Sequence, residues 1–182
     1  MLQFDINASE LRAISDALGA SEKQFKLALS AAIKRTVTSL RTLAARGLRD
    51  ELQLRKIGLL RKRLKTAKIK FGTDGGMQLW FGLNDMPVSW FKGRPKQEDT
   101  GASMRGQKFE GAFVGKSAIK GRNTIFKRKT KARLHIEEQN LAVEEKAKVF
   151  VEDNIFTETE TLFWKYFERE IAARVKYNIG AR

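Results

Sequence analysis

The feature that most constrains the fold is a stripe of apolar residues that recurs every three or four positions early in the chain. The stripe consists of Phe25, Leu29, Ile33, Val37, Leu40, Ala44 and Leu48. This spacing predicts an α-helix from about Glu22 to Leu52, roughly 45 Å long at 1.5 Å per residue. Ser21 and Gln24 form a capping-box pattern at its start, in which each side chain bonds to the other residue's backbone N–H. So long an apolar face has to be covered by other parts of the chain.

A second apolar face lies near the end of the sequence and predicts another long helix. Its residues are Leu162, Phe163, Tyr166, Phe167, Ile171, Ala172 and Val175. Thr157 and Glu160 repeat the capping-box pattern, so this helix is expected to begin there and to end near Ile179, just before Gly180. A separate helix is expected over residues 141–153.

The middle of the chain changes to a period of two, which is typical of strands. Residues 68–72 and 77–83 flank a glycine-containing turn and predict a β-hairpin. Further strands are expected at residues 2–6, 86–91, 107–114, 124–127 and 134–136. The polar stretch 92–105 contains Gly and Pro and predicts an exposed loop that becomes ordered on assembly.

The order of these elements predicts an α+β fold, because the strands follow one another without alternating helices. We expect an antiparallel sheet of about four to six strands packed with a long N-terminal helix and a long C-terminal helix. The prediction is a single domain over residues 1–182. It comprises N-terminal strand and helices (1–66), the β-sheet with its exposed loop (67–136), and C-terminal helices (137–182).

Composition excludes several classes of chemistry. The 182 residues include no Cys and one His, His135, which removes thiolate metal sites and Cys nucleophiles and disfavours a Ser-His-Asp triad. The glycine motifs of nucleotide-binding loops are missing as well. We therefore expect no enzyme activity, no catalytic residue, no metal and no cofactor. No apolar run reaches the roughly 20 residues that span a bilayer, and the N-terminus does not resemble a secretory signal, so we expect a soluble protein without membrane contact.

The net charge of +15 is concentrated in the middle of the chain. Residues 51–75 carry eight basic and two acidic side chains, and residues 92–133 carry thirteen and three. From Leu134 onward, ten acidic residues outnumber seven basic ones. This distribution predicts a polyanion, or an acidic protein surface, as the partner of the basic middle.

We expect the partner-facing basic surface to consist of Lys116, Lys120, Arg122, Lys127, Arg128, Lys129, Lys131 and Arg133. Lysine and arginine neutralise phosphates without reading sequence, and no motif for specific readout is present. Aromatic residues alternate with basic ones at 90–92 and 126–128. Stacking on single strands would require exposed rings, whereas a core position is the expectation for Phe113 and Phe126. The basic segment 54–64 fits either a solvated helix face or a surface for nucleic acid or anionic lipid.

The stretch from Lys108 to Ile136, KFEGAFVGKSAIKGRNTIFKRKTKARLHI, resembles the signature region of the minor tail protein Z-like (tail completion) family of tailed bacteriophages and prophages. The matching segments are Gly111-Ala112-Phe113-Val114, Gly121-Arg122-Asn123, Ile125-Phe126-Lys127-Arg128 and Arg133-Leu134-His135-Ile136. The flanks are similar too, in the helix containing Ala28–Thr36 and in the C-terminal helix. Within the segments, the resemblance implies structural roles for Gly111, Ala112, Phe113, Ile125 and Phe126.

This resemblance implies a structural virion protein at the head-proximal end of the tail. Such a protein completes the tail and joins it to the head and neck around the DNA channel. The resemblance implies a homo-oligomer, a hexameric ring that matches the tail's symmetry, with other tail and neck proteins as partners and DNA nearby. Assembly would take place in the cytoplasm of the bacterial host. The alternative is a nonspecific DNA- or RNA-binding protein that acts free in the cytoplasm.

Overall fold

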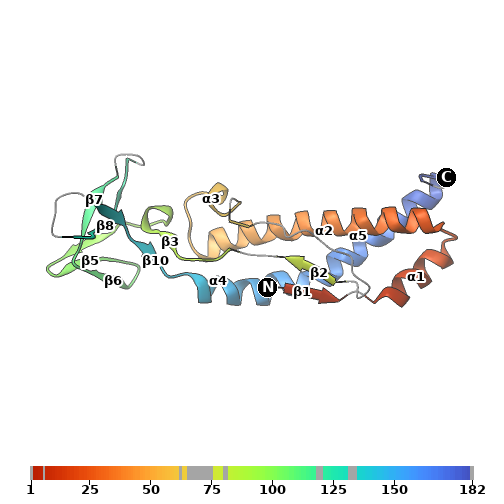
Figure 1. The fold of residues 1–182 in the computed structure, drawn as a ribbon, viewed down its shortest axis with the longest axis horizontal. Helices are drawn as coiled ribbons and strands as arrows, with labels where there is room; N and C mark the ends of the chain where they lie inside the picture. Colours follow the sequence, from red (N-terminus) through yellow and green to blue (C-terminus); the bar gives the residue numbers. More distant parts are fainter. Residues whose placement is uncertain are drawn as a thin grey trace. The chain divides into compact units, whose positions relative to one another are not determined.

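The computed structural model of the protein describes residues 2–5, 7–61, 63–64, 76–79, 82–117, 121–130 and 135–180. It confirms the α+β class, with a long N-terminal helix, α2 (Glu22–Glu51), and a long helical run over residues 144–176 (Figure 1).

The chain divides into two compact units, each assembled from separate stretches of sequence. The helical unit comprises residues 1–46, 61–82 and 150–182, and the sheet unit comprises residues 47–60 and 83–149. These units do not coincide with the predicted parts in sequence order, because each of them combines stretches that are distant along the chain.

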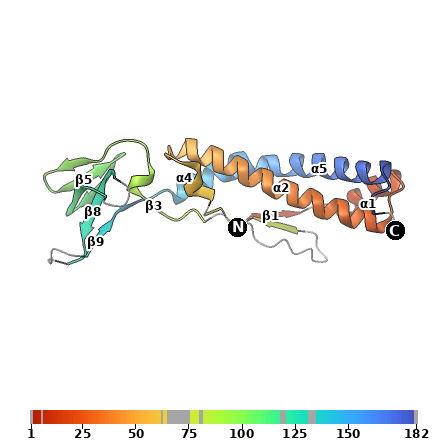
Figure 2. The ribbon, with the colours of Figure 1, turned by 90° about the horizontal axis from the view of Figure 1, so that it is seen from above.

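The helical unit is built around α2 and α5. Its elements are β1 (Leu2–Asp5), α1 (Ala8–Ala17), most of α2, β2 (Gly76–Leu79), the π-helical turn η2 (Glu152–Phe156) and α5 (Thr157–Lys176). Helices α2 and α5 run antiparallel and side by side (Figures 1 and 2). The Gln24 Nε2 donates to the Arg174 carbonyl oxygen at 3.1 Å, and the Ser39 and Tyr166 hydroxyls are 2.8 Å apart. Every residue of the predicted stripe is buried except Phe25, which is half-buried and meets the Phe167 ring edge-on.

The two predicted capping boxes have opposite outcomes. The first is confirmed: the Ser21 N–H donates to Gln24 Oε1 at 2.9 Å, and the Gln24 N–H donates to Ser21 Oγ at 3.2 Å. The second is wrong, because the Thr157 hydroxyl donates to the Asp153 carbonyl at 3.1 Å inside a continuous helix. That helix runs through α4 (Glu144–Val151), η2 and α5 without a free end. Burial of one face, including Val151 and Ile155, outweighs the local capping signal.

The strand β2 pairs with the N-terminal strand β1. The pairing is antiparallel, with Leu2 opposite Leu79 and Asp5 opposite Gly76. The prediction of a strand near residues 77–83 is correct, although β2 ends at Leu79. Among the described residues, β2 thus pairs with a strand that is distant in the sequence. A turn signal alone does not determine which strands pair, so a distant strand can pair with β2. Residues 68–72, the predicted partner, lie outside the described residues.

The sheet unit contains the short helix α3 and most of the strands. Its elements are α3 (Ile57–Arg61), β3 (Met86–Pro87), the 3₁₀ turn η1 (Val88–Trp90), β4 (Lys96–Glu98), β5 (Gly101–Met104), β6 (Gln107–Glu110), β7 (Ala112–Lys116), β8 (Asn123–Arg128), β9 (Ile136–Glu138), β10 (Asn140–Leu141) and α4. Strands β4–β5–β6 form one antiparallel sheet, β7–β8–β9 form a second, and β3 pairs with β10.

The expected single sheet is therefore divided into smaller ones. The predicted strand 107–114 is interrupted at Gly111, whose φ of +65° lies in the left-handed region that glycine tolerates best. The Gly111 N–H bonds to the Thr100 carbonyl at 2.9 Å, so the chain turns there and β7 starts a new sheet.

The exposed loop expected at residues 92–105 is also wrong. It contains β4 and β5, and Ala102 and Met104 are buried. The Gln97 side chain accepts a hydrogen bond from the Val114 N–H at 2.8 Å and donates one to the Gly101 carbonyl at 2.7 Å. This stretch has few apolar side chains, and its pairing with β6 keeps it in the sheet.

Candidate partner-facing surface

The described residues of the candidate basic surface lie on or next to strands β7 and β8. Lys116, Arg122, Lys127, Arg128 and Lys129 are all exposed, as expected. Lys120, Lys131 and Arg133 lie outside the described residues. Figure 2 shows β8 beside β9, whose pairing places the acidic residues of β9 against the basic end of β8.

The basic run at the end of β8 is divided between two faces of the sheet. Lys127 lies opposite Ala112 on β7 and opposite Glu137 on β9. Because side chains alternate along a strand, Lys127 and Lys129 share one face and Arg128 lies on the other. Lys116 shares the face of Lys127, since its register position is an even number of residues from Ala112. We call Lys116, Lys127 and Lys129 the lysine face.

Ion pairing is uneven on the lysine face. Lys129 Nζ lies 2.5 Å from Glu137 Oε1, and both side chains are more than half exposed. Among the described residues, Lys116, Arg122 and Lys127 have no ion-pair partner. These three cations are therefore available to an anion supplied from outside the sheet.

The opposite face carries an aromatic pair. Phe113 and Phe126 lie directly opposite each other, with ring centroids 6.1 Å apart and planes inclined by 35°. The Arg128 guanidinium carbon is 5.9 Å from the centre of the Phe113 ring, within cation–π range. Gly115 leaves room for this arrangement, because a Cβ there would lie 3.1 Å from Phe126 Cδ2. We call Phe113, Phe126 and Arg128 the aromatic face.

The five residues for which the resemblance implies structural roles occupy three different environments. Ala112 and Ile125 are buried in the sheet unit. Phe113 and Phe126 are half-buried, which corrects the expectation that both rings belong to the core. Gly111 forms the turn before β7 and is not part of the strand.

Glu138 fixes β9 to its neighbours. Its Oε1 accepts hydrogen bonds from the Ser89 N–H at 2.9 Å and from the Thr124 hydroxyl at 2.8 Å. Thr124 is fully buried, so its hydroxyl needs this acceptor. Glu138 thus positions the sheet that carries the basic residues. In the sequence it is recognisable only as one of the acidic residues of the C-terminal part.

Some of the positive charge in the middle of the chain serves the fold itself. Arg55 donates from Nε to the Phe91 carbonyl at 2.6 Å and from Nη2 to the Gly93 carbonyl at 2.8 Å. Arg105 donates to the Leu52 carbonyl at 2.6 Å, and its guanidinium lies 5.5 Å from the centre of the Phe91 ring. Both guanidinium groups tie residues 52–55 to the strand region. Charge counting could not identify them, because an arginine that binds carbonyls looks like any other arginine in a sequence.

One exposed ion pair of the sheet unit shifts two pKa values. Arg49 donates two hydrogen bonds of 2.8 Å to the carboxylate of Asp50. The hydrogen bond from Arg49 lowers the pKa of Asp50 below its ordinary value, and the bond to Asp50 raises the pKa of Arg49.

The described residues contain no group of three or more His, Cys, Asp or Glu side chains that could hold a metal ion. None of the helices in the described part of the chain is long and apolar enough to cross a membrane. No protein-family model, curated protein or solved structure matches this chain.

Proposed function

We propose that this protein is a structural, non-enzymatic component of a tailed-phage virion that completes the head-proximal end of the tail. The observation that carries the proposal is the group of three exposed cations without ion-pair partners among the described residues, Lys116, Arg122 and Lys127. They lie within the stretch that resembles the tail completion family. In this role the protein joins the tail to the head and neck around the DNA channel.

A DNA channel suits cations of this kind. Lysine and arginine on an exposed hairpin attract phosphates of any sequence, and the charges act without base contacts. The proposed assembly is a closed homo-oligomer, a hexameric ring that matches the symmetry of the tail and forms in the host cytoplasm. The lysine face then meets passing DNA, and the aromatic face remains for neighbouring tail and neck proteins.

The first test locates the protein. Particles are purified from cells that carry the gene, analysed by mass spectrometry, and labelled with a gold-conjugated antibody against the chain. The expected result is label at the junction of head and tail. Intact particles without the protein would contradict the proposal.

The second test measures the proposed binding to DNA. The variant K116Q/R122Q/K127Q is compared with the control K165Q/R169Q/K176Q, which removes two lysines and one arginine from exposed positions on α5. Affinity for a short random duplex is measured over a range of salt concentrations. We expect the slope of log K against log salt concentration to become less steep by roughly three in the first variant. This is about one unit for each phosphate that is no longer neutralised. Equal slopes for the two variants would remove Lys116, Arg122 and Lys127 from the proposal.

The aromatic face supports the alternative of a free nucleic-acid-binding protein. Half-buried rings beside an arginine can stack on unpaired bases, each stacked base contributing about 1–3 kcal/mol. This alternative predicts tighter binding of single strands than of duplex, loss of that preference in F113A, and absence from purified particles. Particle-bound protein that binds duplex and single strands equally would favour the tail role.

A further inference from the structure

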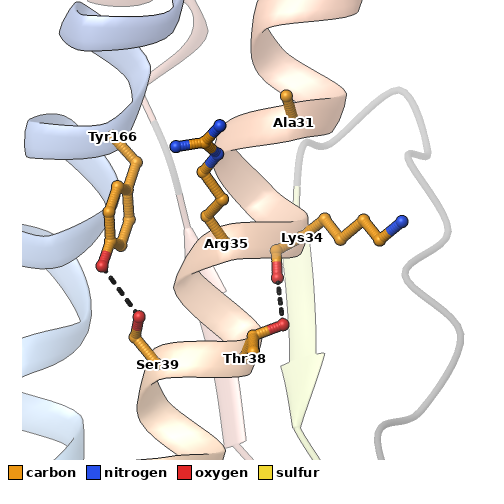
Figure 3. Close-up of a pocket in the computed structure, with 6 residues that line it drawn as sticks. All are labelled: Ala31, Lys34, Arg35, Thr38, Ser39 and Tyr166. Carbon is orange, nitrogen blue, oxygen red and sulfur yellow. Dashed lines mark hydrogen bonds between the residues drawn. The ribbon is translucent and has the colours of Figure 1, made fainter.

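The helical unit contains a pocket of about 460 Å³ beside α2 and α5 (Figure 3). Its lining residues are Ala31, Lys34, Arg35, Thr38, Ser39 and Tyr166. Five of them come from successive turns of α2, and Tyr166 faces them from α5. The volume falls in the range of small-molecule sites, about 300–1,000 Å³. In the sequence, Lys34 and Arg35 lie between the stripe residues Ile33 and Val37, and no motif indicates a site there.

The charge at this pocket is positive because one carboxylate has two guanidinium partners. Arg35 Nε lies 2.8 Å from Glu170 Oε1, and Arg174 Nη1 binds the other oxygen of Glu170. The Glu170 and Arg174 side chains are 10% and 16% exposed, so they already form a neutral, largely buried pair. Arg35 is 52% exposed and adds one positive charge to this neutral pair.

Arg35 is held in place and still has donors to offer. Its Nε is fixed by Glu170, and its two terminal nitrogens have no hydrogen-bond partner among the described residues. A guanidinium anchored at one edge presents the remaining N–H groups in a fixed plane, which matches carboxylate and phosphate oxygens. Lys34 contributes a second exposed cation, which points away from Tyr166 on the other side of the pocket.

The wall opposite Lys34 is flat and apolar. The Tyr166 hydroxyl is 2.8 Å from Ser39 Oγ, so the half-buried ring has a defined position. Thr38 Oγ1 donates to the Lys34 carbonyl at 2.8 Å, which turns its hydroxyl proton toward the helix backbone. Together with Ala31, the ring offers an apolar surface next to the guanidinium.

We propose that this pocket binds a small organic oxyanion, a carboxylate or phosphate attached to a flat apolar group. The oxyanion accepts hydrogen bonds from the free edge of Arg35, and the apolar group lies against Tyr166 and Ala31. Lys34 adds long-range attraction. This inference does not depend on the tail role, because the pocket belongs to the helical unit and uses none of the residues of the lysine face.

The test is calorimetric titration of the full chain with four probes. Phenyl phosphate and benzoate carry both parts of the proposed ligand, phenol lacks the charge, and inorganic phosphate lacks the apolar part. We expect saturable binding at one site per chain for at least one organic anion, with phenol and inorganic phosphate at least roughly tenfold weaker. The preferred organic anion identifies the ligand as a phosphate or a carboxylate.

Two variants and a control tie the binding to this pocket. R35M leaves Glu170 paired with Arg174 and should weaken binding by about tenfold to a hundredfold. Y166L removes the flat wall and should also weaken the organic anions, but not inorganic phosphate. R169M removes an exposed arginine elsewhere on α5 and should bind like the wild type. Circular dichroism confirms that each variant is folded.

Two results would overturn the proposal. One is equal affinity in R35M and R169M, which would reveal attraction to the net charge of the protein and no site. The other is a lack of saturable binding of both organic anions at millimolar concentration.

Discussion

Two aromatic clusters, one in each unit, differ in how deeply they are buried. In the helical unit, Phe163 and Phe167 are fully buried, with stacked rings 6.1 Å apart, and Trp164 meets both of them edge-on. In the sheet unit, Phe113 and Phe126 form a pair that is only half-buried. The first group closes a core, whereas the second leaves part of its ring surface to solvent or to a partner.

Two ion-paired carboxylates, one in each unit, differ in the same way. Glu170 is held between two arginines at 10% exposure, whereas Glu137 meets Lys129 with both side chains more than half exposed. A buried carboxylate has lost its hydration and needs charged partners to stay ionised, whereas an exposed carboxylate is solvated by water. These groups of the helical unit therefore serve stability, whereas the Phe113–Phe126 and Lys129–Glu137 pairs of the sheet unit remain partly at the surface.

The largest expected effect tests the aromatic half of this comparison. F167A should lower the free energy of unfolding by about 3–5 kcal/mol, because a fully buried ring leaves a cavity. F113A should cost about 1–2 kcal/mol, since its ring is already partly in solvent. Urea denaturation followed by circular dichroism measures both. Equal costs would mean that the two aromatic groups are equally structural.

The next effect tests the ionic half. E170Q should cost about 3 kcal/mol, because Arg174 stays largely buried without its counter-charge. E137Q should cost less than about 1 kcal/mol, and 1 M salt should reduce that cost further. The measurement is the urea midpoint of each variant with and without salt. If salt reduced the stability cost of E170Q by as much as that of E137Q, the distinction between a buried and an exposed ion pair would be wrong.

A smaller effect concerns the start of α2. S21A should cost about 1 kcal/mol, because the Ser21 hydroxyl accepts the Gln24 N–H at the helix end. T157A has the same apparent sequence context and should change stability by less than about 0.5 kcal/mol, since Thr157 lies inside a helix. Thermal unfolding of both variants decides the matter. A loss in T157A comparable to that in S21A would restore a helix start at Thr157.

The smallest effect concerns the exposed pair in the sheet unit. Because the pKa of Asp50 is lowered in the folded protein, its contribution is present above the ordinary aspartate value and is lost as the pH falls through the lowered pKa. The urea midpoints of wild type and D50N should therefore differ slightly at pH 7 and converge below about pH 4. Midpoints that diverge on acidification would reverse this assignment.

The helices were largely predictable because their signals are local. The stripe from Phe25 to Leu48 predicted α2 within one residue of its observed end, and the Ser21 cap marked its start. The same kind of signal failed at Thr157, where burial of Val151 and Ile155 continues the helix across the capping pattern. A local capping pattern therefore predicts a helix end correctly only where the burial of neighbouring side chains does not favour a continued helix.

The sheets were less predictable because pairing is not local. Nothing in the sequence near β2 indicates that Leu79 lies opposite Leu2. The run Lys127–Lys129 suggested one basic surface, and strand alternation divided it between two faces. The pocket beside Tyr166 could not be predicted because it joins residues more than 120 positions apart, such as Ser39 and Tyr166.

The same long separation imposes an order of events during synthesis. Helix α2 ends at residue 51, and the helix that covers it, α5, is complete only at residue 176. At about 5–20 residues per second, roughly 6–25 s pass between the two. During that time the apolar stripe of α2 is not yet covered by α5. Exposed apolar surface of this kind favours aggregation, and synthesis speed governs how long the nascent chain carries it.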